Sequence, residues 1–319
     1  MLDDKKEFLV TRGFKFPIFP TEEQKILLSN TFGSTRYIFN HFVDWNKKEM
    51  DKHKESPYFY PKPTSSGFKM ILMLTKMKKD EDTKWLSNVS SVALKQTLLH
   101  LSTSLIGAIN GRKNFPKFKS KSGKQSFTLS ENAYTLSNKI LTIAKSTTPI
   151  DVKWTRDLPT GAKLGNIIIS KTSSDKYFVS ITCTYSPKKI IGSHILGIDL
   201  GITDLATFSD GTTIANLRTF LHYEKKIRTL NKKYSKSKEG SKNKEKRRLR
   251  LAIVHEKMAN IRKDYIHKLT TKLVSENQAI AMESLNIKNM VKNRKLSKHI
   301  LDAGWGMFRR FLEYKTISS

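Results

Sequence analysis

Apolar and polar positions alternate, or apolar ones recur at helical spacing, in successive blocks of the chain. The first block, Phe8–Ile18, predicts a strand that ends near Pro17 and Pro20. Thr21 then offers a helix cap with Gln24 at capping-box spacing. Apolar residues follow at intervals of three and four, and predict a helix pair.

A loop rich in Pro, Ser and Gly over Ser56–Gly67 interrupts these helices. Helices are expected to resume at Phe68–Met77 and from Ser90 to Asn110. The pattern then changes to strands separated by Asn, Pro and Gly turns: Phe127–Leu129, Ile140–Ile143, Ile167–Ile169 and Tyr177–Tyr185. We expect a small β-barrel with a helical insertion.

Two apolar strands in the last part of the chain each carry one carboxylate. Ile195–Gly201 contains Asp199, and Gln278–Asn286 contains Glu283. A second short strand, Asp204–Phe208, follows the first and predicts a hairpin. The order is therefore strand, hairpin, helices, strand, with one carboxylate near the end of each flanking strand.

The segment between these strands is strongly basic. From Lys225 to Lys263 it contains sixteen Lys or Arg and three Glu. Its second half is amphipathic, with apolar residues that step by three or four and predict one buried stripe: Leu251, Val254, Met258, Ile261, Tyr265, Leu269 and Leu273. The charges on the other faces favour contact with a phosphate backbone over a merely solvated helix surface.

Composition supports nucleic acid as the partner. The chain has 59 Lys and Arg against 28 Asp and Glu, a formal net charge of +31. Such a field attracts polyanions. A membrane surface is the competing partner, but we find no transmembrane run, signal peptide or lipidation motif. The single cysteine, Cys183, fits a reducing cytoplasm and cannot form a four-cysteine zinc site.

Several segments resemble one known family. They are Phe14–Gln24, Arg36–Asn40, Phe115–Lys119, Gly240–Glu245, Asn260–Lys268, Asn293–Leu296 and Asp302–Arg310. The sequence of these segments is similar to that of the TnpB family, the transposon-encoded RNA-guided nucleases related to type V CRISPR effectors. The resemblance runs from about residue 10 to residue 315.

The resemblance implies an α+β multidomain fold. Residues 1–20 and 119–193 would form a wedge β-barrel, residues 21–118 a helical recognition domain, and residues 194–319 a RuvC-like domain of the RNase H-like α/β class. The first two would grip guide RNA and the guide–target duplex. Asp199 falls where the family has its first catalytic aspartate, and Glu283 where it has its glutamate.

Further residues are predicted to contact nucleic acid. Lys95 and Gln96 align with the family helix that contacts a short motif beside the target. The others follow from charge and position: Arg36, Lys225, Lys226, Arg228, Lys232, Lys233, Arg247, Arg248, Arg250, Arg262, Lys263 and Arg294. No metal-ligating histidine or cysteine pattern is found.

The family continues beyond the matched text into a zinc ribbon and a third catalytic aspartate, which we do not find here. Two-metal cleavage needs several converging carboxylates. We therefore expect an incomplete RuvC-like domain that lacks the zinc ribbon, with Mg²⁺ bound weakly at most, no zinc, and no cofactor required for binding.

The predicted function is RNA-guided DNA binding without cleavage, in which the protein represses transcription by occupying its target. The expected partners are guide RNA and double-stranded target DNA, in a prokaryotic cytoplasm and nucleoid; the oligomeric state is left open. One alternative is an active endonuclease whose third carboxylate comes from Asp302 or a second subunit. Another is a non-functional remnant or plain RNA-binding protein.

Overall fold

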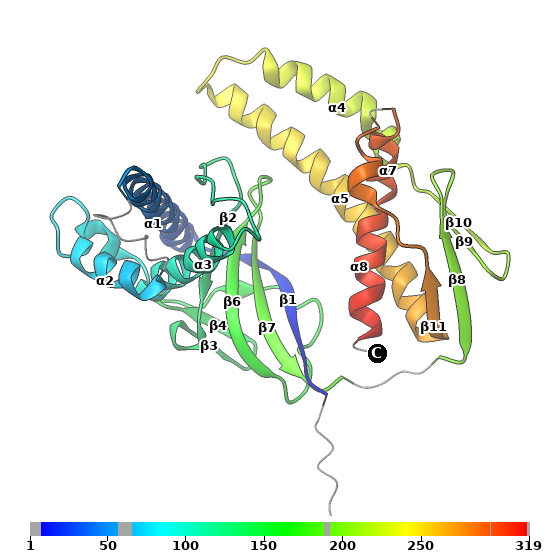
Figure 1. Cartoon of the computed structure of the whole chain (residues 1–319), viewed down its shortest axis with the longest axis horizontal. Helices are drawn as coiled ribbons and strands as arrows, with labels where there is room; N and C mark the ends of the chain where they lie inside the picture. The colour runs from blue at the N-terminus through cyan, green and yellow to red at the C-terminus, as the bar shows by residue number, and fades with distance from the viewer. Residues whose placement is uncertain (1–7, 57–65, 188–191, 294, 318–319) are drawn as a thin grey trace, which may run out of the picture. The chain divides into compact units, whose positions relative to one another are not determined.

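The computed structural model describes residues 8–56, 66–187, 192–293 and 295–317. The chain divides into two compact units (Figure 1). One unit is Thr11–Tyr185, and the other contains the chain from Ser186 onward. Both mix helices and strands, which confirms the α+β class; the predicted assignment of residue ranges to named domains stays a prediction.

A five-stranded sheet forms the base of the first unit, in the order β2-β6-β7-β1-β5. Its strands are β1 (Val10–Phe19), β2 (Gln125–Leu129), β5 (Asp151–Val152), β6 (Lys163–Lys171) and β7 (Tyr177–Tyr185). Strands β3 (Tyr134–Ser137) and β4 (Ile140–Ile143) pair separately. This sheet ends at β2 and β5, and an isolated bridge between Leu141 and Ile150 links β4 to the segment before β5, so closure into the expected barrel stays a prediction.

The strands form where apolar and polar side chains alternate along the sequence. In β7, buried and half-buried residues alternate along almost the whole strand, because one face covers the core and the other does not. Phe16, Ile167, Ile169, Val179 and Ile181 are fully buried on that core. The predicted strand positions in this part of the chain are therefore confirmed.

Helix α1 (Glu22–Glu55) is one helix of 34 residues and not the predicted pair. The predicted capping box is confirmed, since Thr21 and Gln24 exchange hydrogen bonds. The helix continues through Gly33 because no proline follows and the apolar stripe stays in phase.

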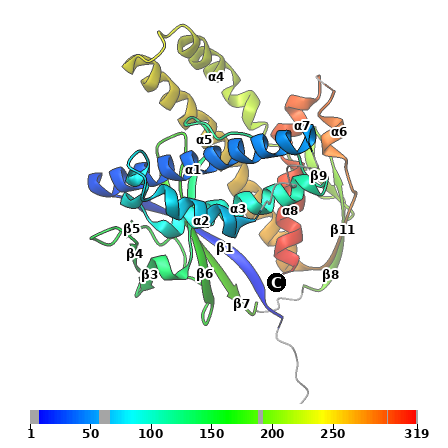
Figure 2. The same ribbon diagram turned by 60° about the vertical axis from the view of Figure 1, so that its left-hand side comes forward.

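Helices α2 (Gly67–Met77) and α3 (Ser91–Ile109) and the 3₁₀ turn η1 (Lys84–Asn88) complete this unit. Figure 2 shows α3 lying along α1. Helix α3 is long and apolar enough to cross a membrane, contrary to the prediction of no such run. Its apolar residues, such as Leu94, Leu98 and Leu101, are fully buried in the helical core, which explains their character without a membrane.

The second unit contains a four-stranded sheet in the order β10-β9-β8-β11. The strands are β8 (His194–Leu200), β9 (Asp204–Phe208), β10 (Thr213–Ala215) and β11 (Asn277–Met282). The hairpin β8–β9 is antiparallel, whereas β8 and β11 are parallel. The predicted order of strand, hairpin, helices and strand is confirmed.

Helices α4 (Thr219–Ser235) and α5 (Lys242–Glu276) connect β10 to β11 as a helical hairpin (Figure 1). After β11 come α6 (Ile287–Met290), α7 (Ser297–Ala303) and α8 (Trp305–Thr316). Helices α5 and α8 cover one face of the sheet, where Ile266, Leu273 and Phe308 meet Leu196 and Ile198.

The predicted stripe on α5 is correct except in its middle. Val254, Met258 and Leu273 are buried, but Ile261 is 36% exposed and Ile266 is 1% exposed. Helix α8 packs against the C-terminal part of α5, so the buried face there is set by that neighbour. The apolar spacing alone could not show which of two nearby isoleucines would face α8.

Candidate active site and nucleic-acid interface

The two predicted carboxylates lie at the same edge of the second sheet. In the parallel pairing of β8 and β11, Ile198 is opposite Met282. Asp199 and Glu283 follow these partners directly. Adjacent parallel strands are about 4.8 Å apart, and register partners point to the same face. Ile198 and Met282 contact the core, so the carboxylates belong to the opposite, open face, where both residues are exposed.

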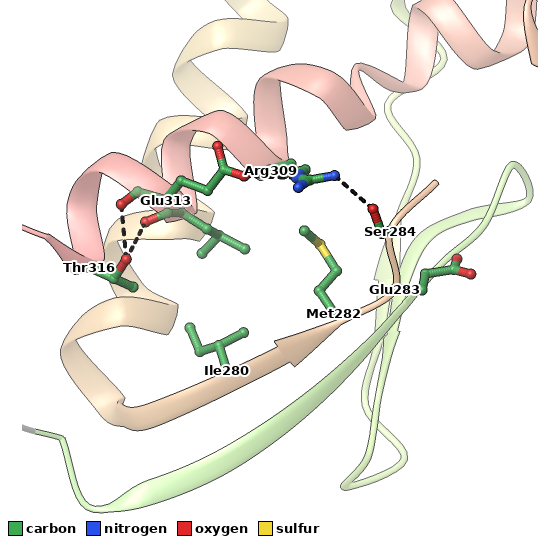
Figure 3. Close-up of a pocket in the computed structure, with 8 residues that line it drawn as sticks. Ile280, Met282, Glu283, Ser284, Arg309, Glu313 and Thr316 are labelled. Carbon is green, nitrogen blue, oxygen red and sulfur yellow. Dashed lines mark hydrogen bonds and ion pairs between the residues drawn. The ribbon is translucent and has the colours of Figure 1, made fainter. Parts of the chain in front are cut away.

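A small cavity of about 230 Å³ lies on the other side of β11, against α8 (Figure 3). Arg309 borders it, with Nε 2.7 Å from Glu313 Oε1 and Nη1 donating to Ser284 Oγ at 3.2 Å. The Glu283 side chain points away from the group formed by Met282, Arg309 and Glu313 (Figure 3). Glu283 thus also lines this cavity, while its carboxylate is directed toward the open face of the sheet.

Asp302, the alternative source of a third carboxylate, and two other acids of this unit, Glu313 and Asp210, have partners of their own. Asp302 is bonded to Arg262 and to the Phe220 backbone. Glu313 pairs with Arg309. The backbone N–H of Thr212 donates to Asp210 and holds the pKa of that carboxyl below its usual range. Within the described ranges, no three His, Cys, Asp or Glu residues gather as a metal site.

The carboxylate pair suits a hard divalent cation. Mg²⁺ prefers oxygen ligands and is commonly held by one or two carboxylates together with water and phosphate oxygens. Asp199 and Glu283 supply such oxygens on an exposed face, where a phosphodiester strand has access. The described residues thus fit one Mg²⁺ more readily than a closed protein-only cage.

All five predicted cationic residues on α4 are on its solvent side. Lys225, Lys226, Arg228, Lys232 and Lys233 are all exposed. On α5, Arg250 and Lys263 are exposed too. Among the residues that the structure describes, the ion pair that these side chains make is a 3.8 Å approach of Arg228 to Glu224, which leaves the others available to a phosphate backbone.

Three predicted arginines instead have partners within the protein. Arg262 is bonded to Asp302, and Arg248 to Glu245. Arg247 Nη1 donates to the Lys233 carbonyl at 2.8 Å and to Ser237 Oγ at 2.9 Å, which fastens α4 to α5. Arg247 thus acts in the packing of the hairpin, Arg248 pairs within α5 and Arg262 joins α5 to α7, and a role of all three in binding nucleic acid stays a prediction.

The predicted contacts in the first unit divide in the same way. Lys95 is exposed on α3 and Gln96 is half-buried beside it. Arg36 donates to Gln125 Oε1 at 3.0 Å, so it supports the start of β2. Arg294 lies outside the described residues. Sequence reasoning missed the connection between α3 and β2, although its composition signals it: six cations and no acid over residues 111–124.

Comparison with known proteins shows the family to which the chain belongs. The OrfB_IS605 family, described as "Probable transposase", matches residues 178–294. A "Putative RNA-guided DNA endonuclease" of Streptomyces pristinaespiralis is 35% identical over 309 residues, which cover 96% of this chain and 75% of that protein. The chain belongs to the TnpB family. The expected family resemblance is thus confirmed, whereas truncation and loss of nuclease activity are not shown.

Three further matches were found. The "Putative RNA-guided DNA endonuclease InsQ" of Escherichia coli K12 is 26% identical and covers 96% of this chain and 78% of its own length. Among solved structures, a Cas12f1–sgRNA–target DNA complex matches with a TM-score of 0.46 and 12% identity, covering 97% of this chain and 88% of that one. A family described as "Helix-turn-helix domain" matches residues 10–55, where this TnpB protein has one strand and one helix.

Proposed function

We propose that this protein binds DNA under the direction of a guide RNA, and that Asp199 and Glu283 are its contribution to Mg²⁺-dependent cleavage of that DNA. The supporting observation is the parallel register of β8 and β11, which brings both carboxylates to one open sheet face. Relatives over nearly the whole chain are named as RNA-guided DNA endonucleases. The net charge of +31 supports a polyanionic ligand.

The chemistry asked of each residue is limited and specific. When bound, Mg²⁺ would stabilise charge on a phosphate and lower the pKa of a water nucleophile. Asp199 and Glu283 would hold the ion through their carboxylate oxygens. Their exposure would leave room around a bound ion for water and for phosphate oxygens.

A second candidate function is occupancy of the target without cutting, as in a transcriptional repressor. The observation that favours it is the engagement of Asp302, the nearest sequence candidate for a further carboxylate, with Arg262 and Phe220. A pair of carboxylates holds Mg²⁺ less firmly than three do. Repression by a steric block requires only that the bound complex dissociates slowly.

One experiment separates these functions. The full chain is purified with its co-expressed RNA, the RNA is sequenced, and guide-matched and scrambled DNA are offered with Mg²⁺ or with EDTA. Cleavage of matched DNA that Asp199→Asn and Glu283→Gln abolish, while binding persists, supports the nuclease. Matched binding without cleavage supports occupancy.

The control variant is Asp264→Asn, an exposed acid on α5 paired with Lys268. We expect it to change neither binding nor cleavage. RNA that co-purifies while matched and scrambled DNA bind equally would contradict both functions and leave a plain RNA-binding protein.

A further inference from the structure

The connection between α3 and β2 concentrates positive charge. Residues 111–124, here called the α3–β2 loop, contain six cations and no Asp or Glu. All six are exposed, and within the described ranges no carboxylate forms an ion pair with any of them: Arg112, Lys113, Lys117, Lys119, Lys121 and Lys124. Elsewhere in this unit, exposed lysines such as Lys48 and Lys84 have acidic partners.

Asn40 of α1 holds the middle of the loop. Its Nδ2 donates to the Lys119 carbonyl at 2.9 Å, and its Oδ1 accepts the Lys119 backbone N–H at 2.8 Å. One side chain thus satisfies both polar groups of a loop residue that lies 79 positions away. Such a clamp fixes the backbone of the loop without neutralising its charge.

Gln125, the first residue of β2, holds the far end of the loop. Its Nε2 lies 2.9 Å from the carbonyl oxygens of Lys121 and Gly123. Its Oε1 accepts a hydrogen bond from Arg36 at 3.0 Å, which orients the amide. Arg36 therefore acts here as a positioning residue, and the loop is ordered by neutral contacts before any ligand arrives.

The side chains of the ordered loop carry two chemistries. Lys119 is exposed as a whole residue, but its Nζ lies 3.9 Å from the centre of the Phe39 ring, and partial burial of the ammonium group, together with the charge of Lys124, lowers the pKa of Lys119. Uncompensated like charges of this kind are stabilised by an anion. Phe118, between Lys117 and Lys119, is 58% exposed and belongs to neither buried cluster described for this unit.

We propose that the α3–β2 loop is a binding site for single-stranded nucleic acid, in which its lysines contact successive phosphates and Phe118 stacks on an unpaired base. Basic grooves with interleaved aromatic side chains bind single strands in this way. A duplex offers the phosphates but hides its base faces, so the exposed ring favours a single strand. The choice of nucleic acid as the polyanion rests on the proposed function.

The test uses the full chain, freed of co-purified RNA by high salt, and labelled 12-nucleotide RNA and DNA single strands of one sequence. The triple variant Lys117→Gln, Lys119→Gln, Lys121→Gln should reduce the slope of log affinity against log salt by about 2, at about 0.7 per phosphate contact. Phe118→Ala should weaken single-strand binding about tenfold. A blunt duplex should respond to the triple variant but not to Phe118→Ala.

Two controls match these changes. Lys48→Gln, Lys52→Gln, Lys54→Gln removes three charges from α1, each paired with an acid, and Phe68→Ala removes a ring that is 77% exposed. Both control variants should bind the single strands within twofold of the parent's affinity and should leave the slope of log affinity against log salt unchanged. The loop triple with Lys→Arg should keep the slope, which shows that a loss in the Gln variant reflects charge.

An unchanged slope in the Gln triple, or an equal loss in the α1 control, would overturn the site. A loss confined to the RNA strand assigns the loop to the guide, and a loss confined to DNA assigns it to a DNA single strand; both support the site. If the loop variants leave single-strand binding unchanged while the protein still binds guide-matched DNA selectively, this site alone would be overturned. If the loop variants weaken single-strand binding but the protein does not prefer guide-matched DNA, the proposed function alone would be overturned.

Discussion

The carboxylate of Asp302 accepts a hydrogen bond from the guanidinium of Arg262, with 2.6 Å between Oδ1 and Nη2. Its second oxygen accepts the backbone N–H of Phe220 at 2.8 Å. The side chains are 6% and 21% exposed, so water screens the pair little. One acid thus joins α4, α5 and α7, and its role is in the fold of the second unit.

Replacing Asp302 should therefore reduce stability. Asp302→Ala leaves Arg262 without its partner and the first turn of α4 without its acceptor, and we expect the free energy of unfolding to fall by about 3 kcal/mol. Asp302→Asn keeps an acceptor and should cost less. Urea denaturation measures both. Normal stability of Asp302→Ala with loss of DNA cleavage would instead show that Asp302 serves the metal site.

Arg247 should be important for its hydrogen bonds as well as its charge. Arg247→Lys keeps the charge but cannot reproduce both contacts to Lys233 and Ser237, so amides at the tip of the α4–α5 hairpin should exchange about tenfold faster. Hydrogen exchange by mass spectrometry measures this. Arg250→Lys, at an exposed site, is the matched control and should leave the tip unchanged.

Gln24 should contribute more than an ordinary capping residue. It completes the capping box with Thr21, and its Nε2 also lies 3.0 Å from the Pro149 carbonyl. Because Gln24 is 4% exposed, Gln24→Ala leaves buried groups unpaired and should cost about 2 kcal/mol. The exposed neighbour Glu23→Ala is the control in thermal unfolding. A loss no larger than in that control would contradict the structure.

Asn40 should control the order of the α3–β2 loop. Asn40→Ala removes both hydrogen bonds to Lys119, and we expect faster amide exchange near Lys119 together with weaker single-strand binding, because a mobile loop pays more entropy on binding. Asn30→Ala on the exposed face of the same helix is the control. Faster exchange with unchanged single-strand affinity would separate the clamp from binding.

The prediction of Asp199 and Glu283 as family carboxylates shows what local sequence patterns can and cannot determine. Each strand was predicted from its own alternation, and each carboxylate from its position and the family resemblance. Neither pattern states that β8 and β11 are parallel neighbours, since 35 residues of α5 separate the hairpin from β11 in addition to α4. Before the structure was known, only the family resemblance implied that Asp199 and Glu283 are adjacent. The parallel register of β8 and β11 shows that they are.

The predicted cationic surface shows the opposite case. Charge counting found the α4–α5 hairpin correctly, but it could not separate exposed cations such as Lys226 from Arg247 and Arg262, which are bonded within the fold. It also missed the role of Arg36, whose partner Gln125 lies 89 residues away. A count of charged residues cannot predict which of them form ion pairs or hydrogen bonds when segments distant in sequence pack together.

The sequence by itself determined the strands, the capping box at Thr21, the basic hairpin and the carboxylate-bearing segments, because alternation, capping and net charge depend on residues close in the chain. Tertiary structure alone decided that α1 is continuous, that Ile266 replaces Ile261 in the core, and that Asp302 and Asn40 bind partners far away. The physical reason is that these outcomes depend on which distant surfaces exclude water together, and no local period specifies that choice.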